Sequence, residues 1–258
     1  MLCYTAWMKS LLALNWKMAP EKPTDAIRLA KSVAALSKKY KKNISFIACP
    51  PFVHLAAVAK ASKAFRVGGQ LVAADSTEAQ TGLISAGMLK ASGAQYCIVG
   101  HSEARARGEN NEVVAQQIAR LVEKKIIPIA CVGERARDTQ GWYLSEVKDQ
   151  VESILSALPR AALRQLVIAY EPVWAIGVRA ERVATPAECR EMIIYIRKVI
   201  ADTCGAKASE SVTIVYGGSV DEKNARTFLT EGAAQGHLVG RASLDVKRLG
   251  ALAASLIT

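Results

Sequence analysis

The stretch LVIAYEPVWAIGVRAERVATPAE, residues 166–188, contains a strand, a loop and the first turn of a helix, in that order. Leu166 to Tyr170 is a continuous apolar run, which is typical of a strand that is covered on both faces. The run ends at Glu171, and the following Pro172 favours an extended backbone there. Thr185-Pro186-Ala187-Glu188 combines a capping residue, a proline suited to the first helical position and the glutamate of a capping box. The stretch therefore predicts a strand-to-helix unit with an unexplained carboxylate at the strand end.

The same unit recurs along the chain. Apolar, β-rich runs predict eight strands, at Leu11–Trp16, Ile44–Cys49, Phe65–Val72, Tyr96–Gly100, Ile126–Cys131, Leu166–Glu171, Val212–Gly217 and His237–Gly240. Helical patterns follow them, at Thr24–Tyr40, Leu55–Ser62, Ser85–Ser92, Glu112–Lys124, Gly141–Ala157, Pro186–Thr203, Glu222–Thr230 and Asp245–Ser255. Eight such units in about 250 residues predict an α/β protein with a (β/α)8 barrel of parallel strands, and an open doubly wound sheet is the alternative. No GxGxxG follows the first strand, so the dinucleotide-binding form of that alternative loses its main support.

The length and the hydropathy pattern predict one catalytic barrel domain over residues 1–258, because no linker or shift in composition divides the chain. Residues 1–9 are left as an N-terminal extension or a consequence of the chosen start codon. No apolar run approaches the roughly 20 residues that span a bilayer, and the start lacks a clear cleavage site of a signal peptide. We expect a soluble, cytoplasmic protein without a membrane partner.

The formal net charge of +11, from 34 Lys and Arg against 23 Asp and Glu, favours anionic partners. The basic residues are spread along the chain without interleaved aromatic residues, which argues against nucleic acid. The six cysteines are scattered, with no CxxC pair and no histidine close by, which argues against a zinc site and a disulfide framework. A small anionic partner and no metal are therefore expected.

Function-capable groups gather where the predicted strands end, the place at which the loops of such a barrel converge. They are Asn15, Lys17, His101, Glu134, Glu171, Gly217-Gly218-Ser219 and Gly240-Arg241. Each of these groups has an ordinary structural explanation when it is taken alone. A lysine can extend to solvent, a histidine can be held by hydrogen bonds, and glycines are common in tight turns. Glu171 is harder to dismiss, because a carboxylate that ends an apolar strand must be paired, hydrated or used. Glycine-rich turns before a helix expose N–H groups that bind phosphate, so a small phosphorylated substrate is the hypothesis.

Six motifs, each after a predicted strand, resemble the triosephosphate isomerase family over nearly the whole chain. In the family's order they are Asn15-Trp16-Lys17-Met18, Val99-Gly100-His101-Ser102-Glu103, Ala130-Cys131-Val132-Gly133-Glu134, residues 169–177 (AYEPVWAIG), Tyr216-Gly217-Gly218-Ser219-Val220 and Leu238-Val239-Gly240. The resemblance implies a TIM (β/α)8 barrel and an aldose–ketose isomerase. Such an enzyme interconverts dihydroxyacetone phosphate and D-glyceraldehyde 3-phosphate through an enediolate, without a cofactor, in cytoplasmic glycolysis and gluconeogenesis. The alternative is an isomerase of a related four-carbon sugar phosphate with the same mechanism.

The resemblance also implies roles for individual residues. Glu171 would be the base that moves a proton between two carbons, His101 the electrophile that polarises the oxygens, and Lys17 a positive charge beside the substrate. The substrate-binding groups would be Asn15, Lys17, Gly177, Ser219, Gly240 and Arg241. Residues that support them would be Glu103, Cys131 and Tyr216. The segment Pro172–Ala184 would form a lid that Tyr216 and Ser219 latch.

A homodimer through the loop 75–85 is implied as well, with Thr81 and Gly82 at the tip of the loop. Leu83 replaces the glutamate that is usual in the family, and Ala104 replaces the arginine expected to pair with it. Losing both partners leaves neither charge buried alone, so we expect a dimer with a remodelled interface.

Two further departures from the family's pattern concern the loops at the phosphate. The lid contains Val178-Arg179-Ala180-Glu181-Arg182, is two residues longer than usual and lacks a second glycine, which predicts reduced turnover with the same substrate. Arg241 replaces the second glycine after strand eight, and its N–H can still face phosphate if the backbone there suits a non-glycine residue.

Two rival functions are weighed against the isomerase. A Schiff-base aldolase needs an inward lysine at a strand end, for which Lys17 is the only candidate. A non-catalytic anion-binding protein with this fold would have lost the base or the electrophile, yet Lys17, His101 and Glu171 are all present.

Overall fold

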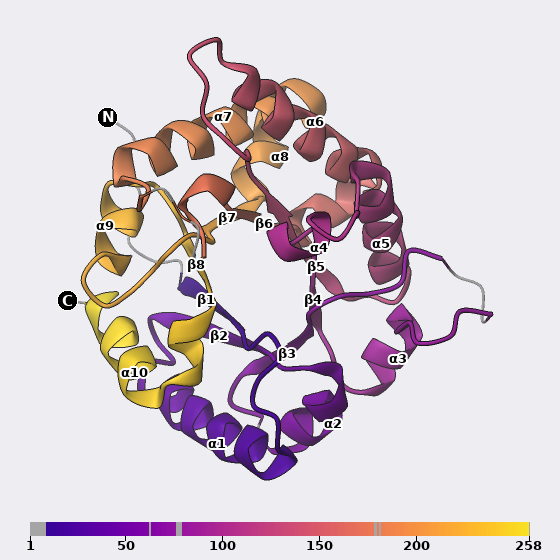
Figure 1. The fold of residues 1–258 in the computed structure, drawn as a ribbon, viewed down its shortest axis with the longest axis vertical. Coiled ribbons are helices and arrows are strands. Elements are labelled where there is room, and N and C mark those ends of the chain that lie inside the picture. Colours follow the sequence, from indigo (N-terminus) through magenta and orange to yellow (C-terminus); the bar gives the residue numbers. More distant parts are fainter. Residues whose placement is uncertain (1–8, 62, 76–78, 178–179, 181, 258) are drawn as a thin grey trace.

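The strands close into a barrel in the computed structural model, which describes residues 9–61, 63–75, 79–177, 180 and 182–257 (Figure 1). They pair in sequence order, each pairing is parallel, and β8 returns to β1. Their bounds are β1 Ser10–Asn15, β2 Ile44–Cys49, β3 Arg66–Gly69, β4 Tyr96–Val99, β5 Ile127–Val132, β6 Val167–Tyr170, β7 Thr213–Tyr216 and β8 Gly236–Val239. The predicted (β/α)8 barrel is confirmed, and the doubly wound alternative is wrong.

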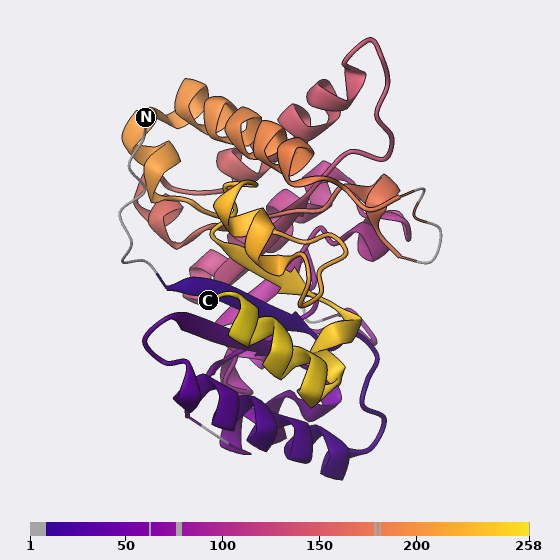
Figure 2. The ribbon, with the colours of Figure 1, turned by 90° about the vertical axis from the view of Figure 1, so that its left-hand side faces the viewer.

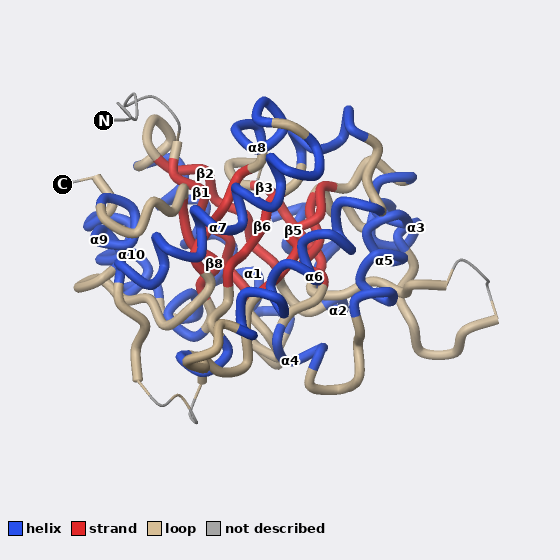
Figure 3. Tube along the Cα trace, turned by 90° about the horizontal axis from the view of Figure 1, so that it is seen from above, coloured by secondary structure: helices blue, strands red, loops and turns tan. Residues whose placement is uncertain are grey.

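Helices surround the barrel, as the views along and across it show (Figures 1, 2 and 3). The α-helices are α1 Pro23–Lys39, α2 Phe52–Ala61, α3 Ala86–Ala91, α4 Ser102–Arg105, α5 Asn111–Glu123, α6 Trp142–Ser156, α7 Pro186–Cys204, α8 Ala206–Ser211, α9 Ala225–Thr230 and α10 Val246–Ser255. Short 3-10 helices are η1 Arg160–Gln165, η2 Val173–Ala175 and η3 Arg241–Leu244. In the described part of the chain, no helix is both long enough and apolar enough to cross a bilayer.

Two of the differences from the predicted elements have local causes. The strand predicted to end at Val72 ends at Gly69. At the next residue a side chain, rather than strand backbone, donates to neighbouring carbonyls: the amide of Gln70 donates to the carbonyl oxygens of Lys17 and Cys49, each at 2.8 Å. The short helices α4 and α8 were not predicted, because four to six residues are too few to show a helical hydrophobic period.

The core has two layers, as the alternation of side chains along a strand requires. Ala13 faces the barrel interior, while Leu12 and Leu14 belong to the layer between strands and helices. The interior layer comprises Ala13, Ile47, Cys49, Ile98, Ile129, Cys131, Val167, Ala169, Val215 and Leu238. These side chains fill the barrel interior, so a ligand at the carboxyl ends of the strands would lie above this layer.

The start of α7 is fixed by the predicted capping box, which is confirmed. Thr185 Oγ1 accepts from the N–H of Glu188 at 3.2 Å, and Glu188 Oε2 accepts from the N–H of Thr185 at 2.8 Å. The loop between β6 and α7 therefore ends at a defined point near the barrel mouth.

Candidate active site

A cavity of about 370 Å³ opens at the carboxyl ends of the strands. All eight residues to which the sequence assigned catalysis or substrate binding line it together: Asn15, Lys17, His101, Glu171, Gly177, Ser219, Gly240 and Arg241. They come from the ends of β1, β4 and β6 and from the loops after β6, β7 and β8. Glu103, Cys131 and Tyr216 do not line the cavity but lie beside residues that do.

Lys17 follows β1 in an unusual backbone conformation. Its φ is 53°, in the left-handed region that non-glycine residues seldom occupy. Asn15 is buried and accepts from the N–H of Lys17 through Oδ1 at 3.0 Å, which holds this turn. Lys17 Nζ lies 2.5 Å from Glu103 Oε1. Partial burial favours the neutral form of Glu103, yet the hydrogen bond and charge of Lys17 hold the pKa of its carboxyl below the usual range.

His101 caps α4 through its ring. Nδ1 accepts from the N–H of Glu103 at 3.2 Å, so the neutral ring has its proton on Nε2. Nε2 lies 3.3 Å from Glu171 Oε1. The other carboxylate oxygen of Glu171 accepts from the N–H of Ser102 at 3.1 Å. An imidazole N–H and a carboxylate therefore face each other at the cavity wall.

Two glycines allow the backbone to pack against Glu171, which is 2% exposed. A Cβ on Gly133 would lie 1.9 Å from the carbonyl oxygen of Glu171, and a Cβ on Gly217 would lie 2.8 Å from its Cγ. Cys131 lies beside this carboxylate. Mainly because it is buried, the pKa of its thiol is raised well above the ordinary value. Cys131 is therefore a neutral supporting side chain rather than a nucleophile.

The loops after β7 and β8 form the other end of the cavity. Ser219 Oγ donates to the carbonyl of Ala175 at 3.2 Å, so this loop contacts the loop after β6. The hydroxyl of Tyr216 is buried and has no hydrogen-bond partner among the described residues. Arg241 begins η3, and its φ is not positive, so the backbone suits a non-glycine residue, as the sequence analysis required.

Several cavity residues were missed from the sequence, namely Val183, Asp221, Asn224 and Arg248. Asn224 supports the loop of Ser219, because its amide donates to the carbonyl of Ser219 at 3.1 Å. The spacing Asp221-x-x-Asn224 is a turn signal that would have found this pair. Arg248 is in the first turn of α10, from which a long side chain reaches back toward the barrel mouth.

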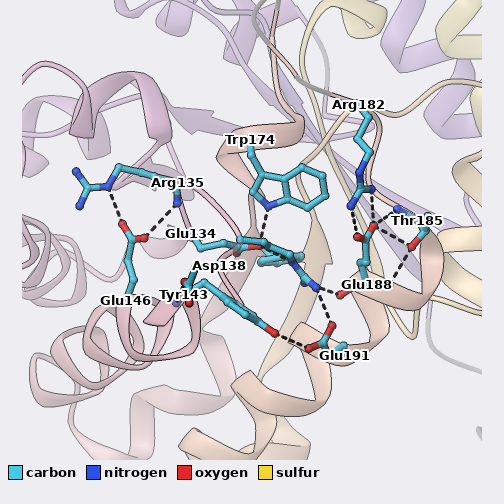
Figure 4. Close-up of polar contacts among 12 residues, drawn as sticks. Glu134, Arg135, Asp138, Tyr143, Glu146, Trp174, Arg182, Thr185, Glu188 and Glu191 are labelled. Atoms are coloured by element: carbon cyan, nitrogen blue, oxygen red, sulfur yellow. Dashed lines mark hydrogen bonds and ion pairs between the residues drawn. The ribbon is translucent and has the colours of Figure 1, made fainter. Parts of the chain in front are cut away.

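Glu134 was noted at the end of β5 without a role, and it does not line the cavity. It is fully buried, and its Oε1 accepts from the hydroxyl of Tyr170 at 2.9 Å, from Nε1 of Trp174 at 2.8 Å and from Nε of Arg137 at 3.2 Å (Figure 4). This carboxylate therefore holds Trp174 in place, near the beginning of the segment that connects β6 to α7.

The sequence profile described as triosephosphate isomerase matches residues 10–256 of this chain. The chain belongs to the triosephosphate isomerase family. Relatives called triosephosphate isomerase include one from Porphyromonas gingivalis (strain ATCC BAA-308 / W83), 36% identical over 244 residues, which are 93% of this chain and 96% of the relative. One from Magnetococcus marinus is 38% identical over 92% of this chain and 94% of the relative. One from Clostridium botulinum (strain Okra / Type B1) is 35% identical over 94% of this chain and 98% of the relative.

Two of the chain's departures from the usual triosephosphate isomerase pattern, Leu83 and Ala104, are among the described residues. Leu83 is 48% exposed in the loop before α3, and Ala104 is buried in α4. Thr81 and Gly82 lie in the same loop and do not line the cavity, and among the described residues no atom beyond the chain neighbours lies within 4 Å of a Cβ built on Gly82. The lid positions 178, 179 and 181 and the loop positions 76–78 lie outside the described residues.

Proposed function

We propose that this chain interconverts dihydroxyacetone phosphate and D-glyceraldehyde 3-phosphate as one catalytic domain, without metal or cofactor. The observation that carries the proposal is the meeting of Lys17, His101 and Glu171 at one cavity in a chain of this family. The test is a coupled assay with D-glyceraldehyde 3-phosphate, with a four-carbon aldose phosphate in parallel. If only the four-carbon compound were converted, the substrate would be the larger sugar phosphate and not the triose phosphate.

The chemistry follows from the two facing groups. Glu171, as the base, takes a proton from C1 of dihydroxyacetone phosphate, and the electron pair of the C–H bond moves into an enediolate. The N–H of His101 Nε2 stabilises the oxygen that becomes negative, as a preorganised donor does. Glu171 then returns the proton to C2, and the proton of the C1 hydroxyl passes to the C2 oxygen, so that C1 becomes the aldehyde and C2 carries the hydroxyl. The Ser102 N–H that now holds Glu171 at 3.1 Å must release it when the substrate is in place.

Lys17 supplies a cation beside the developing enediolate, and its partner Glu103 holds the ammonium at the cavity. Asn15 fixes the strained turn that aims it. The phosphate binds at the opposite end, against the backbone N–H groups of Gly177, Ser219, Gly240 and Arg241. These residues line the cavity together.

The first prediction concerns Arg248, an exposed arginine that lines the phosphate end of the cavity. Replacement by Ala should raise KM about threefold to tenfold with little change in kcat, because a cation near the phosphate binds substrate and transition state alike. The measurement is steady-state kinetics at low and at high salt, and the difference should shrink at high salt. Lys247→Ala, on the same turn but outside the cavity lining, is the control, and an equal effect there would contradict the assignment.

The second prediction concerns assembly, for which we propose a homodimer through the loop 75–85. Met18, Leu83 and Met88 are 94%, 48% and 52% exposed, and the proposed interface would cover them. Sedimentation at micromolar concentration should give twice the chain mass, and Leu83→Asp should shift the protein toward the monomer. A wild-type monomer under these conditions would refute the dimer.

The proposed place of the reaction is glycolysis and gluconeogenesis in the cytoplasm. The substrate is a small triose phosphate, and neither nucleic acid nor membrane is a partner in this proposal. Fractionation of cells that express the chain would test the compartment.

A further inference from the structure

Arg182 lies near the end of the loop that connects β6 to α7, in the part of the loop that departs from the family's pattern (Figure 4). Its guanidinium carbon is 4.6 Å from the centre of the Trp174 ring, within the range of a cation–π contact. Its Nη1 donates to Glu188 Oε2 at 2.9 Å and its Nη2 donates to Glu188 Oε1. One side chain thus joins the beginning of the loop to the first turn of α7.

Both partners of Arg182 are themselves fixed. Trp174 is buried and donates to the buried carboxylate of Glu134, and the guanidinium of Arg137 also lies over its ring, at 5.8 Å. Glu188 completes the capping box of α7. Hydrogen bonds from Arg182, with help from Thr185, lower the pKa of Glu188 to about 2, so this carboxylate is charged at neutral pH.

The residues next to these contacts form one wall of the cavity. Ile176 and Gly177 follow Trp174 after one residue, Val183 follows Arg182, and all three line the cavity. Arg182 itself does not line it. The arginine therefore can act on a bound substrate only through the position of its neighbours.

We propose that Arg182 is a positioning residue, which holds the wall formed by Ile176, Gly177 and Val183 against the phosphate end of the substrate. The inference rests on the proposed function. Ordering a longer connection costs more entropy, and this loop is two residues longer than is usual in the family. Anchoring Arg182 on Trp174 and Glu188 offsets that cost at the end of the loop nearest the cavity.

The first test is steady-state kinetics. Arg182→Ala should raise KM about fivefold to tenfold while kcat stays within threefold, because the wall contacts the part of the substrate that does not react. The inhibition constant of inorganic phosphate should rise by the same factor. Arg182→Lys should fall between the wild type and Arg182→Ala, since an ammonium keeps the charge but cannot donate to both oxygens of Glu188 while it lies over the indole. Loss of folded protein alone lowers the apparent kcat and leaves KM unchanged.

The matched control is Arg135→Ala. Arg135 is also an exposed arginine paired with a glutamate, at 2.9 Å from Glu146, but this pair lies outside the cavity lining (Figure 4). Its removal should leave KM unchanged. An equal rise in KM for Arg135→Ala, or no rise for Arg182→Ala, overturns the proposal.

The second test breaks the same pair from the other side. Gln can still serve in a capping box, so Glu188→Gln keeps the cap and removes the charge. It should raise KM as Arg182→Ala does, and the double variant should be no worse than either single one, because both remove one interaction. If the rise in KM of the double variant equals the product of the two single rises, the proposal is overturned.

A readout without substrate separates this inference from the proposed function. The N–H of Thr185 is held by Glu188, so amide hydrogen exchange of a peptide that ends at residue 185 should be about tenfold faster in Arg182→Ala. Exchange in the rest of α7 should not change. If the wild type has no isomerase activity but exchange responds in this way, the proposed function fails and the anchoring role stands. Unchanged exchange refutes the anchoring role.

Discussion

Glu171→Gln should lower kcat by about 10³- to 10⁴-fold, the upper part of what general base catalysis contributes. The amide has nearly the same shape but cannot accept the proton from carbon. It can still accept from the N–H of Ser102 and face Nε2 of His101, so the fold and KM should change little. The measurement is the coupled assay together with thermal unfolding.

Glu171→Asp separates the position of the base from its presence. It keeps the carboxylate but withdraws it by one methylene, and a misplacement of about 1 Å costs about 100-fold. The drop should therefore appear in kcat, with KM little changed. Glu146→Gln, which alters a half-buried glutamate that is paired with Arg135 and lies outside the cavity lining, is the control and should be fully active. A Glu171→Gln enzyme that keeps more than a tenth of the wild-type kcat contradicts the role of base.

The sequence was sufficient to predict the barrel because parallel strands covered on both faces leave continuous apolar runs. Leu166–Tyr170 is such a run, and its carboxyl end marks where Glu171 meets the cavity. The rule that strand ends converge then brought together residues as distant in sequence as Asn15 and Gly240, which do line one cavity. Their catalytic roles remain proposals.

What the sequence did not show depends on side-chain direction rather than on strand pattern. Arg248 lines the cavity from a helix, and Val183 lines it from the loop just before α7. Glu134 occupies a strand end like Glu171, yet three donors turn it into a buried support for Trp174. A strand-end carboxylate thus predicts a buried partner network as readily as a catalytic group, and only the geometry separates the two.

Gly133→Ala should lower kcat at least 100-fold without touching a catalytic side chain. The added Cβ would lie 1.9 Å from the carbonyl oxygen and 2.5 Å from the carbonyl carbon of Glu171, so one backbone must shift. Gly133 is held on both sides, because its N–H donates to Gln150 Oε1 at 2.7 Å and its carbonyl accepts from Gln150 Nε2 at 3.1 Å. Much of the displacement therefore falls on Glu171, where about 1 Å costs about 100-fold.

Unfolding measurements separate this effect from a simple loss of stability. Overpacking typically costs about 1–3 kcal/mol and more where a backbone has to shift, so the defect of Gly133→Ala is measured as kcat per folded molecule. The control is Gly250→Ala in α10, where the nearest atom to the new Cβ, Leu36 Cδ2, is 3.7 Å away, an ordinary contact. That variant should keep full activity, because nothing has to move. If folded Gly133→Ala keeps kcat within tenfold of the wild type, the base does not need the backbone position that Gly133 allows, and the catalytic assignment of Glu171 loses its structural support.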